Sequence, residues 1–121
     1  RRYDMAVCHI APQYTTANPE SEFNIEGELY EEWNSLLSKM GVRVMLTGHM
    51  HKAFVLEKND KRSLRENSFP IIVGSVTDDD YRIGAALSFS GDDLSVKFTD
   101  AEHKITEEYA INLPSGSVIK Y

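Results

Sequence analysis

The feature that most constrains the fold is a helix pattern lying between two short apolar runs. The runs Tyr3–Cys8 and Val42–Leu46 each predict a buried strand. Between them, large apolar residues, Trp33 among them, recur at helical spacing from Leu29 to Met40 and predict a face that packs into the core, with Gly41 placed as a left-handed cap. Strand, helix and strand form a βαβ unit with a right-handed crossover and parallel strands. Both strands therefore end at the same edge of one sheet.

The second half of the chain predicts an antiparallel series of strands. Turn signals at Asn59-Asp60, Asp78–Asp80 and Gly91-Asp92 separate short β-rich runs. The runs are FVLEK, FPIIVGSV, YRIGAALSFS, LSVKFTD and EEYAINL. The 121 residues suit one domain, and no repeat or linker divides them. We therefore predict a single α/β domain over residues 1–121, a βαβ unit followed by antiparallel strands.

The charge and the apolar content of the chain give no indication that it binds nucleic acid or a membrane. The net charge is −6 and the basic residues are scattered, so nothing indicates binding to a nucleic-acid backbone or to an anionic membrane. No apolar run approaches the roughly 18 to 20 residues that span a bilayer. The single cysteine, Cys8, fits a reducing compartment and an exported protein equally, so the compartment stays open. The chain begins RRYDMAV, without an initiator Met, and we expect it to be a piece of a longer protein.

Three histidines follow the two strands of the predicted βαβ unit. His9 comes after the first strand, and His49 and His51 come after the second, in the sequence GHMH that begins at Gly48. Ligands bind at the carboxyl ends of parallel strands, so the three imidazoles should converge on one edge. In an extended loop His49 and His51 project to one side, and Gly48 lets the backbone pass close to a metal or a phosphate. Imidazole suits zinc, iron and manganese, so these residues predict a metal site.

Other candidate residues carry weaker signals. Asp78–Asp80 lack the ligand spacing of a calcium loop and predict a solvated turn. His103 predicts an exposed hairpin surface. Cys8 should point away from His9 and pack against the core rather than act as a nucleophile. The polar segment Gln13–Gly27 follows His9 and forms either a wall of a substrate pocket or a variable surface loop.

The two histidine motifs resemble those of a known enzyme family. VCHIAP, followed after a helix by VRVMLTGHMHKA, is similar to the C-terminal half of the calcineurin-like metallophosphoesterases, which carry a strand-His motif and then Gly-His-x-His. The resemblance is specific over Met5–Phe54 and general, in β-rich character, over Phe69–Asn112. It implies that His9 and His49 ligate one of two divalent metal ions (Mn, Fe or Zn) and His51 the other. It also implies half of a two-sheet β-sandwich flanked by helices, with one of the sheets in this chain.

The acidic motifs of that family do not occur in this sequence. They are Asp-x-His, Gly-Asp-x-x-Asp and Gly-Asn-His-Asp/Glu, they lie upstream in the family, and Asp4 is the only acid before His9. We therefore expect a C-terminal fragment, lacking the N-terminal half, of a binuclear-metal phosphoesterase that hydrolyses phosphate esters with a metal-activated hydroxide. The fragment alone would bind one metal ion or none and would be inactive.

Two further expectations concern the partners of the chain and a rival function. The apolar surface left uncovered on the truncated sheet predicts a homodimer. The alternative to a phosphoesterase fragment is a non-catalytic β-rich interaction module. In that module His9, His49 and His51 would hold a structural zinc ion or no metal.

Overall fold

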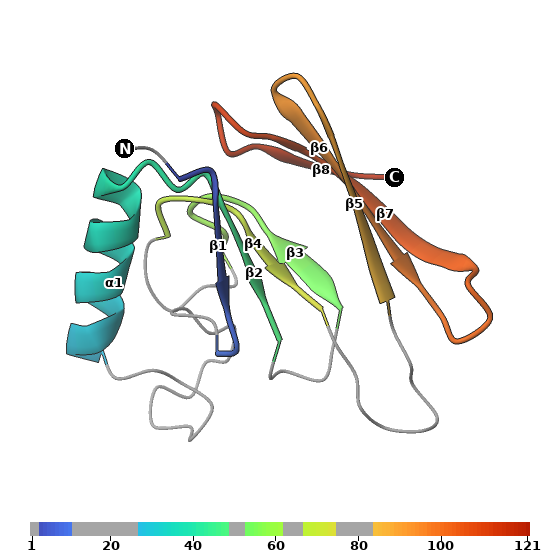
Figure 1. Cartoon of the computed structure of the whole chain (residues 1–121), viewed down its shortest axis with the longest axis horizontal. Coiled ribbons are helices and arrows are strands. Elements are labelled where there is room, and N and C mark those ends of the chain that lie inside the picture. Colours follow the sequence, from blue (N-terminus) through green and yellow to red (C-terminus); the bar gives the residue numbers. More distant parts are fainter. Residues whose placement is uncertain (1–2, 11–26, 49–52, 62–66, 75–83) are drawn as a thin grey trace.

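The computed structural model describes residues 3–10, 27–48, 53–61, 67–74 and 84–121. Within these residues the chain forms one helix and eight strands, arranged in two sheets (Figure 1). In chain order the elements are β1 (Met5–Cys8), α1 (Gly27–Lys39), β2 (Val44–Thr47), β3 (Phe54–Leu56), β4 (Ile71–Val73), β5 (Gly84–Ser90), β6 (Asp93–Thr99), β7 (Ile105–Asn112) and β8 (Val118–Lys120). The α/β fold class predicted from the sequence is confirmed.

The first sheet has the strand order β1-β2-β4-β3. β1 pairs in parallel with β2, so the predicted βαβ unit is confirmed. β4 also pairs in parallel with β2, and only β3 is antiparallel to its neighbour. The prediction that every strand after the βαβ unit is antiparallel is therefore wrong at β4. All three residues of β4 are buried, which is the environment of a central parallel strand covered on both faces.

The second sheet is an antiparallel meander in the order β5-β6-β7-β8. Gly91 and Asp92 form the two-residue loop between β5 and β6, and Gly91 has a φ of 59°, which confirms the predicted turn. Asn59 also has a positive φ, of 56°, in the turn after β3. Sequence reasoning missed the short strand β8, which pairs with β7.

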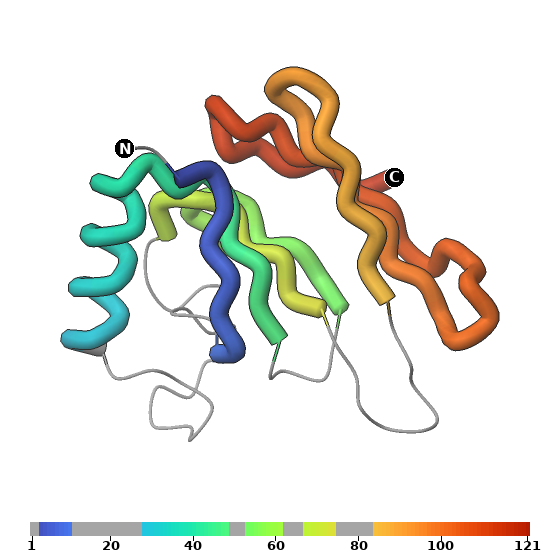
Figure 2. Tube along the Cα trace, in the orientation of Figure 1, coloured from blue at the N-terminus to red at the C-terminus, as the bar shows by residue number. Residues whose placement is uncertain are grey.

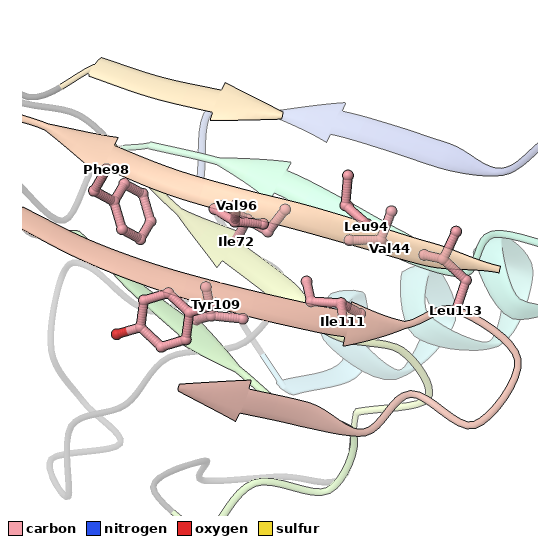
Figure 3. Packing of buried hydrophobic residues seen from close by; sticks show 9 residues of the cluster. Val44, Ile72, Leu94, Val96, Phe98, Tyr109, Ile111 and Leu113 are labelled. Carbon is pink, nitrogen blue, oxygen red and sulfur yellow. The ribbon is translucent and has the colours of Figure 1, made fainter. Parts of the chain in front are cut away.

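The two sheets pack face to face with α1 on the outer face of the first (Figure 2). Alternate residues of β6, namely Leu94, Val96 and Phe98, are fully buried and face Val44 and Ile72 of the first sheet (Figure 3). The expectation of one sheet in this chain is therefore wrong, because both sheets of a sandwich are present. Flanking by helices holds on one side only, since among the described residues no helix covers the outer face of the second sheet.

α1 packs on the first sheet through a face that only partly matches the predicted one. Tyr30 is buried and Leu37 packs against the core, while Leu29 is 40% and Leu36 is 54% exposed. Trp33 is only half-buried and lies outside the core clusters, so its prediction as a core residue is wrong. The face is fixed by Asn34, whose amide donates to Ser68 Oγ at 3.1 Å and whose Oδ1 accepts from Ser68 N at 3.1 Å.

The end of α1 leads the chain directly into β2. Gly41, with a φ of 86°, donates from its N–H to the carbonyl of Ser38, and Val42 N–H donates to the carbonyl of Leu37. This pair of hydrogen bonds is the Schellman motif, and it confirms Gly41 as the predicted cap. Val42 is used in the cap, which explains why β2 begins at Val44 rather than at Val42. Among the described residues no helix has the length and apolar character needed to cross a bilayer.

Candidate functional site

The carboxyl ends of three parallel strands meet at one edge of the first sheet. Cys8 is level with Thr47, and Thr47 is level with Val73, so β1, β2 and β4 end together. Beyond the last paired residues, Gly74 N–H donates to the carbonyl of Thr47 at 2.9 Å. The chain leaves the sheet at the same edge after each of these strands, which is where open parallel sheets bind ligands.

His9 and Gly48 are joined at this edge by a backbone hydrogen bond. The N–H of Gly48 donates to the carbonyl of His9 at 3.0 Å, and the side chain of His9 is exposed. The bond continues the β1–β2 ladder by one step beyond Thr47, so the residue before His49 lies beside His9. The predicted ligands His49 and His51 lie outside the described residues, and the convergence of three imidazoles stays a prediction.

Thr47, the last residue of β2, links this edge to β4, and sequence reasoning missed it. It is 5% exposed, and its hydroxyl donates to the carbonyl of Ile72 in β4 at 3.3 Å. The signal in the sequence was a single hydroxyl residue between an apolar run and a glycine.

Gly74 was also missed, although FPIIVG repeats the pattern of an apolar run ended by glycine. Its hydrogen bond to Thr47 places the exit of β4 beside that of β2. Asp78–Asp80 follow Gly74 in the sequence, and their predicted turn lies outside the described residues.

Cys8 packs against a core cluster, as predicted, and this cluster lies on the helix side of the sheet. Its side chain is half-buried against the core cluster below α1, and its thiol donates to the carbonyl of Ile10 at 2.9 Å. The predicted pocket wall or surface loop Gln13–Gly27 lies outside the described residues except at its last residue. Gly27 begins α1, so the helix starts before the predicted loop ends.

Asp4 lies at the opposite end of β1 from His9. Its Oδ1 accepts from Arg43 Nη2 at 2.8 Å and from Arg43 Nε at 3.0 Å. Five residue steps along β1 separate it by roughly 16 Å from His9 at the histidine edge, the sheet edge where β1, β2 and β4 end. Asp4 therefore cannot supply a carboxylate to a metal held by His9.

His103 lies in the hairpin between β6 and β7 and is exposed, as predicted. It has a φ of 64°, and Asp100 Oδ1 accepts hydrogen bonds from the N–H groups of Glu102 and Lys104 on either side of it. His103 is therefore a turn residue, and it lies far along the chain from His9, His49 and His51.

The donor chemistry at the edge fits a transition-metal ion. Imidazole is a ligand for manganese, iron and zinc, and the exposed His9 presents one at the carboxyl end of β1. Within the residues that the structure describes, no three His, Cys, Asp or Glu side chains gather in a group that could hold a metal ion. The remaining predicted ligands, His49 and His51, belong to a segment that the structure does not describe.

Comparison with models of known protein families and with curated protein sequences gave no match. The resemblance to the calcineurin-like metallophosphoesterases therefore rests on the two histidine motifs and on their position in the βαβ unit.

Proposed function

We propose that this chain is the C-terminal part of a metal-dependent phosphoesterase, and that the longer protein hydrolyses phosphate esters. The observation that supports the proposal is the hydrogen bond of 3.0 Å from Gly48 N to His9 O. It joins the ends of the two motif-bearing strands, which are 39 positions apart in the sequence. A metal site shared between the motifs requires that proximity.

In this proposal the metal ligands would be His9 and His49 for one divalent ion and His51 for the other. When bound, the ions would draw charge from the phosphate oxygens and lower the pKa of a water molecule. The chain itself fixes the strand ends that lead into the two histidine motifs. Thr47, through its buried hydroxyl, ties β2 to β4, and Gly48 ties β2 to β1.

The acidic motifs of the family do not occur in this sequence, and among the described residues Asp4 is paired with Arg43 at the far end of β1, away from the proposed metal site. We therefore predict that the purified 121-residue chain, supplied with Mn²⁺, does not hydrolyse p-nitrophenyl phosphate or its bis ester. The measurement is absorbance of released nitrophenolate. Hydrolysis by this chain that disappears in the His51→Ala variant would contradict the prediction.

The proposal is tested in the longer protein by steady-state kinetics on bis-p-nitrophenyl phosphate with Mn²⁺. We expect His9→Ala, His49→Ala and His51→Ala each to lower kcat/KM by at least about 100-fold, since the loss of groups that support a metal site costs that much or more. His103→Ala is the matched control, because this histidine lies in an exposed hairpin, and it should leave kcat/KM unchanged.

The rival function, a non-catalytic interaction module, predicts a different result. The longer protein would then show no metal-dependent hydrolysis, and a structural zinc ion, if held, would raise Tm without conferring activity. Full hydrolytic activity in all three histidine variants would also reject the proposed metal site.

A further inference from the structure

The two lateral sides of the sandwich are closed differently. On one side β3 lies against β7 and β8, since Val55, Tyr109, Val118 and Lys120 line a common hollow. The Lys120 ammonium lies 5.6 Å from the centroid of the Tyr109 ring and 3.2 Å from Glu107 Oε1. The Tyr109 hydroxyl donates to Glu107 Oε2 at 2.7 Å. Charged and polar groups thus cover the core on this side.

On the opposite side lie β1 and β5, the other ends of the two strand orders (Figure 3). Val7 follows Met5 on the face of β1 that looks toward the second sheet, yet it is 74% exposed. Phe89 shares a cross-strand row with the buried Leu94 and Ile111, yet it is 54% exposed. Apolar side chains of both inner faces are therefore uncovered on this side.

Within the part of the chain that the structure describes, β5 lacks the usual protections of an edge strand. It is seven residues long and carries no charged side chain, whereas β1 has four residues and β3 and β8 have three each. Natural edge strands are kept from pairing with other chains by shortness, charge, proline or a covering element. No strand among the described residues pairs with the outer edge of β5.

The backbone of β5 presents hydrogen-bonding groups at this edge. In a two-residue hairpin the flanking residues, Ser90 and Asp93, form a hydrogen-bonded pair. The pattern alternates along an antiparallel ladder, so Ser88 and Ala86 also direct their N–H and C=O groups toward β6. The N–H and C=O groups of Ala85, Leu87 and Phe89 therefore point toward the open edge.

We propose that β5 is a homodimerisation strand, which pairs antiparallel with β5 of a second copy about a two-fold axis at Leu87. The two meanders then form one continuous sheet. In this register Leu87 meets the partner's Leu87 as a hydrogen-bonded pair, and Ala85 meets the partner's Phe89. On the outer face Ala86 meets the partner's Ser88.

A second copy is the partner that suits this strand. Every large residue in the register faces a small one or its own equivalent, so the strand is complementary to itself, as an isologous interface requires. Two copies of a chain with net charge −6 repel each other, but no charged side chain of β5 enters this contact. The pairing also covers Phe89, which supplies apolar burial where the sandwich is open.

The proposal is tested on the 121-residue chain by sedimentation equilibrium and by hydrogen exchange at several protein concentrations. We expect a monomer–dimer equilibrium, with the amides of Ala85, Leu87 and Phe89 exchanging more slowly as the dimer forms. A chain that stays monomeric overturns the proposal. A dimer in which these amides exchange at the monomer rate also overturns it, because another surface would then carry the contact.

A variant pair gives the second readout. In the double variant Ala86→Lys/Ser88→Lys, both substituted residues are exposed, and each lysine faces a lysine of the partner across the axis. Like charges directly opposite each other destabilise a strand pair, so the dissociation constant of the dimer should rise roughly tenfold. The control Ile119→Lys adds a charge to β8, on the other side of the sandwich, and should leave the equilibrium unchanged. A double variant whose dimer dissociation constant equals that of the wild type overturns the proposal. If circular dichroism shows that the double variant is unfolded, the hydrogen-exchange data of the wild type decide.

Discussion

Single residues define how the histidine edge is built and how the opposite end of the sheet is held. At the histidine edge, the buried hydroxyl of Thr47 and the backbone of Gly48 fix where β2 ends. At the opposite end, Asn67 is 1% exposed, and its amide donates to the carbonyls of Glu57 at 2.8 Å and Phe69 at 3.0 Å. The sequence predicted the first edge because glycine and histidine are conspicuous after an apolar run. It did not reveal Asn67, whose role depends on contacts between two separate strands.

Substitution of Asn67 should destabilise the first sheet. Asn67→Ala leaves the buried carbonyl of Phe69 and the partly buried carbonyl of Glu57 without their donor, which we expect to lower the free energy of unfolding by about 1–3 kcal/mol. Urea denaturation followed by circular dichroism measures the change. The control Asn59→Gly replaces an exposed turn residue with positive φ and should be near neutral. Equal stability of Asn67→Ala and the wild type would show that water replaces the amide.

Glu107 should make stability depend on pH in the acid range. The hydrogen bond from the Tyr109 hydroxyl, with a further contribution from Lys120, lowers the pKa of Glu107 below its ordinary value of 4.5, against an opposing effect of burial. Because the folded-state pKa is depressed, the stabilisation is complete above pH 4.5 and is lost as pH falls through the folded-state pKa. Glu107→Gln should remove this part of the acid dependence of Tm. An acid dependence identical in Glu107→Gln and the wild type would contradict the assignment.

At the scale of elements, the sequence predicted what local patterns determine. The helix, its glycine cap and the turn at Gly91 follow from residues close together in the chain. The parallel pairing of β1 with β2 follows from the strand–helix–strand order. The parallel pairing of β4 was missed because β4 inserts between β2 and β3 in the sheet, and no local signal specifies that strand order. The buried face of α1 was predicted only in part, at Leu37, because Asn34, a polar residue, fixes the helix against Ser68.

The cap of α1 can be tested by removing its glycine. Gly41→Ala places a side chain at a φ of 86°, in the left-handed region, and should lower the free energy of unfolding by about 1–2 kcal/mol. The measurement is urea denaturation. The control Ser35→Ala, at an exposed position of the same helix, should be neutral or slightly stabilising because alanine favours helix. A Gly41→Ala variant as stable as its control would show that the cap does not constrain the entry into β2.

At the scale of the whole molecule, two sheets share one core that the sequence alone did not place in this chain. Apolar residues alternate with polar ones along the strands, but this alternation does not show which sheet the apolar face of a strand packs against. The sandwich depends on contacts between β6 and the first sheet, where Phe98 is fully buried in one cluster with Val44 and Ile72. Within the second sheet, Phe98 also meets Tyr109 of β7 edge to face, at 5.9 Å between ring centroids. The histidine edge belongs to the first sheet, which packs against the second, so the geometry of the site depends on both sheets.

The proposed function requires that His9 and the Gly-His-x-His segment hold metal together at the edge where β1 and β2 end. The most direct measurement is the metal content of the longer protein, purified with Mn²⁺ and analysed by mass spectrometry, in the wild type and in His9→Ala. We predict two ions per chain in the wild type and the loss of one in His9→Ala, with His103→Ala unchanged. A wild-type protein without metal, or a His9→Ala variant that retains both ions, would contradict the claim.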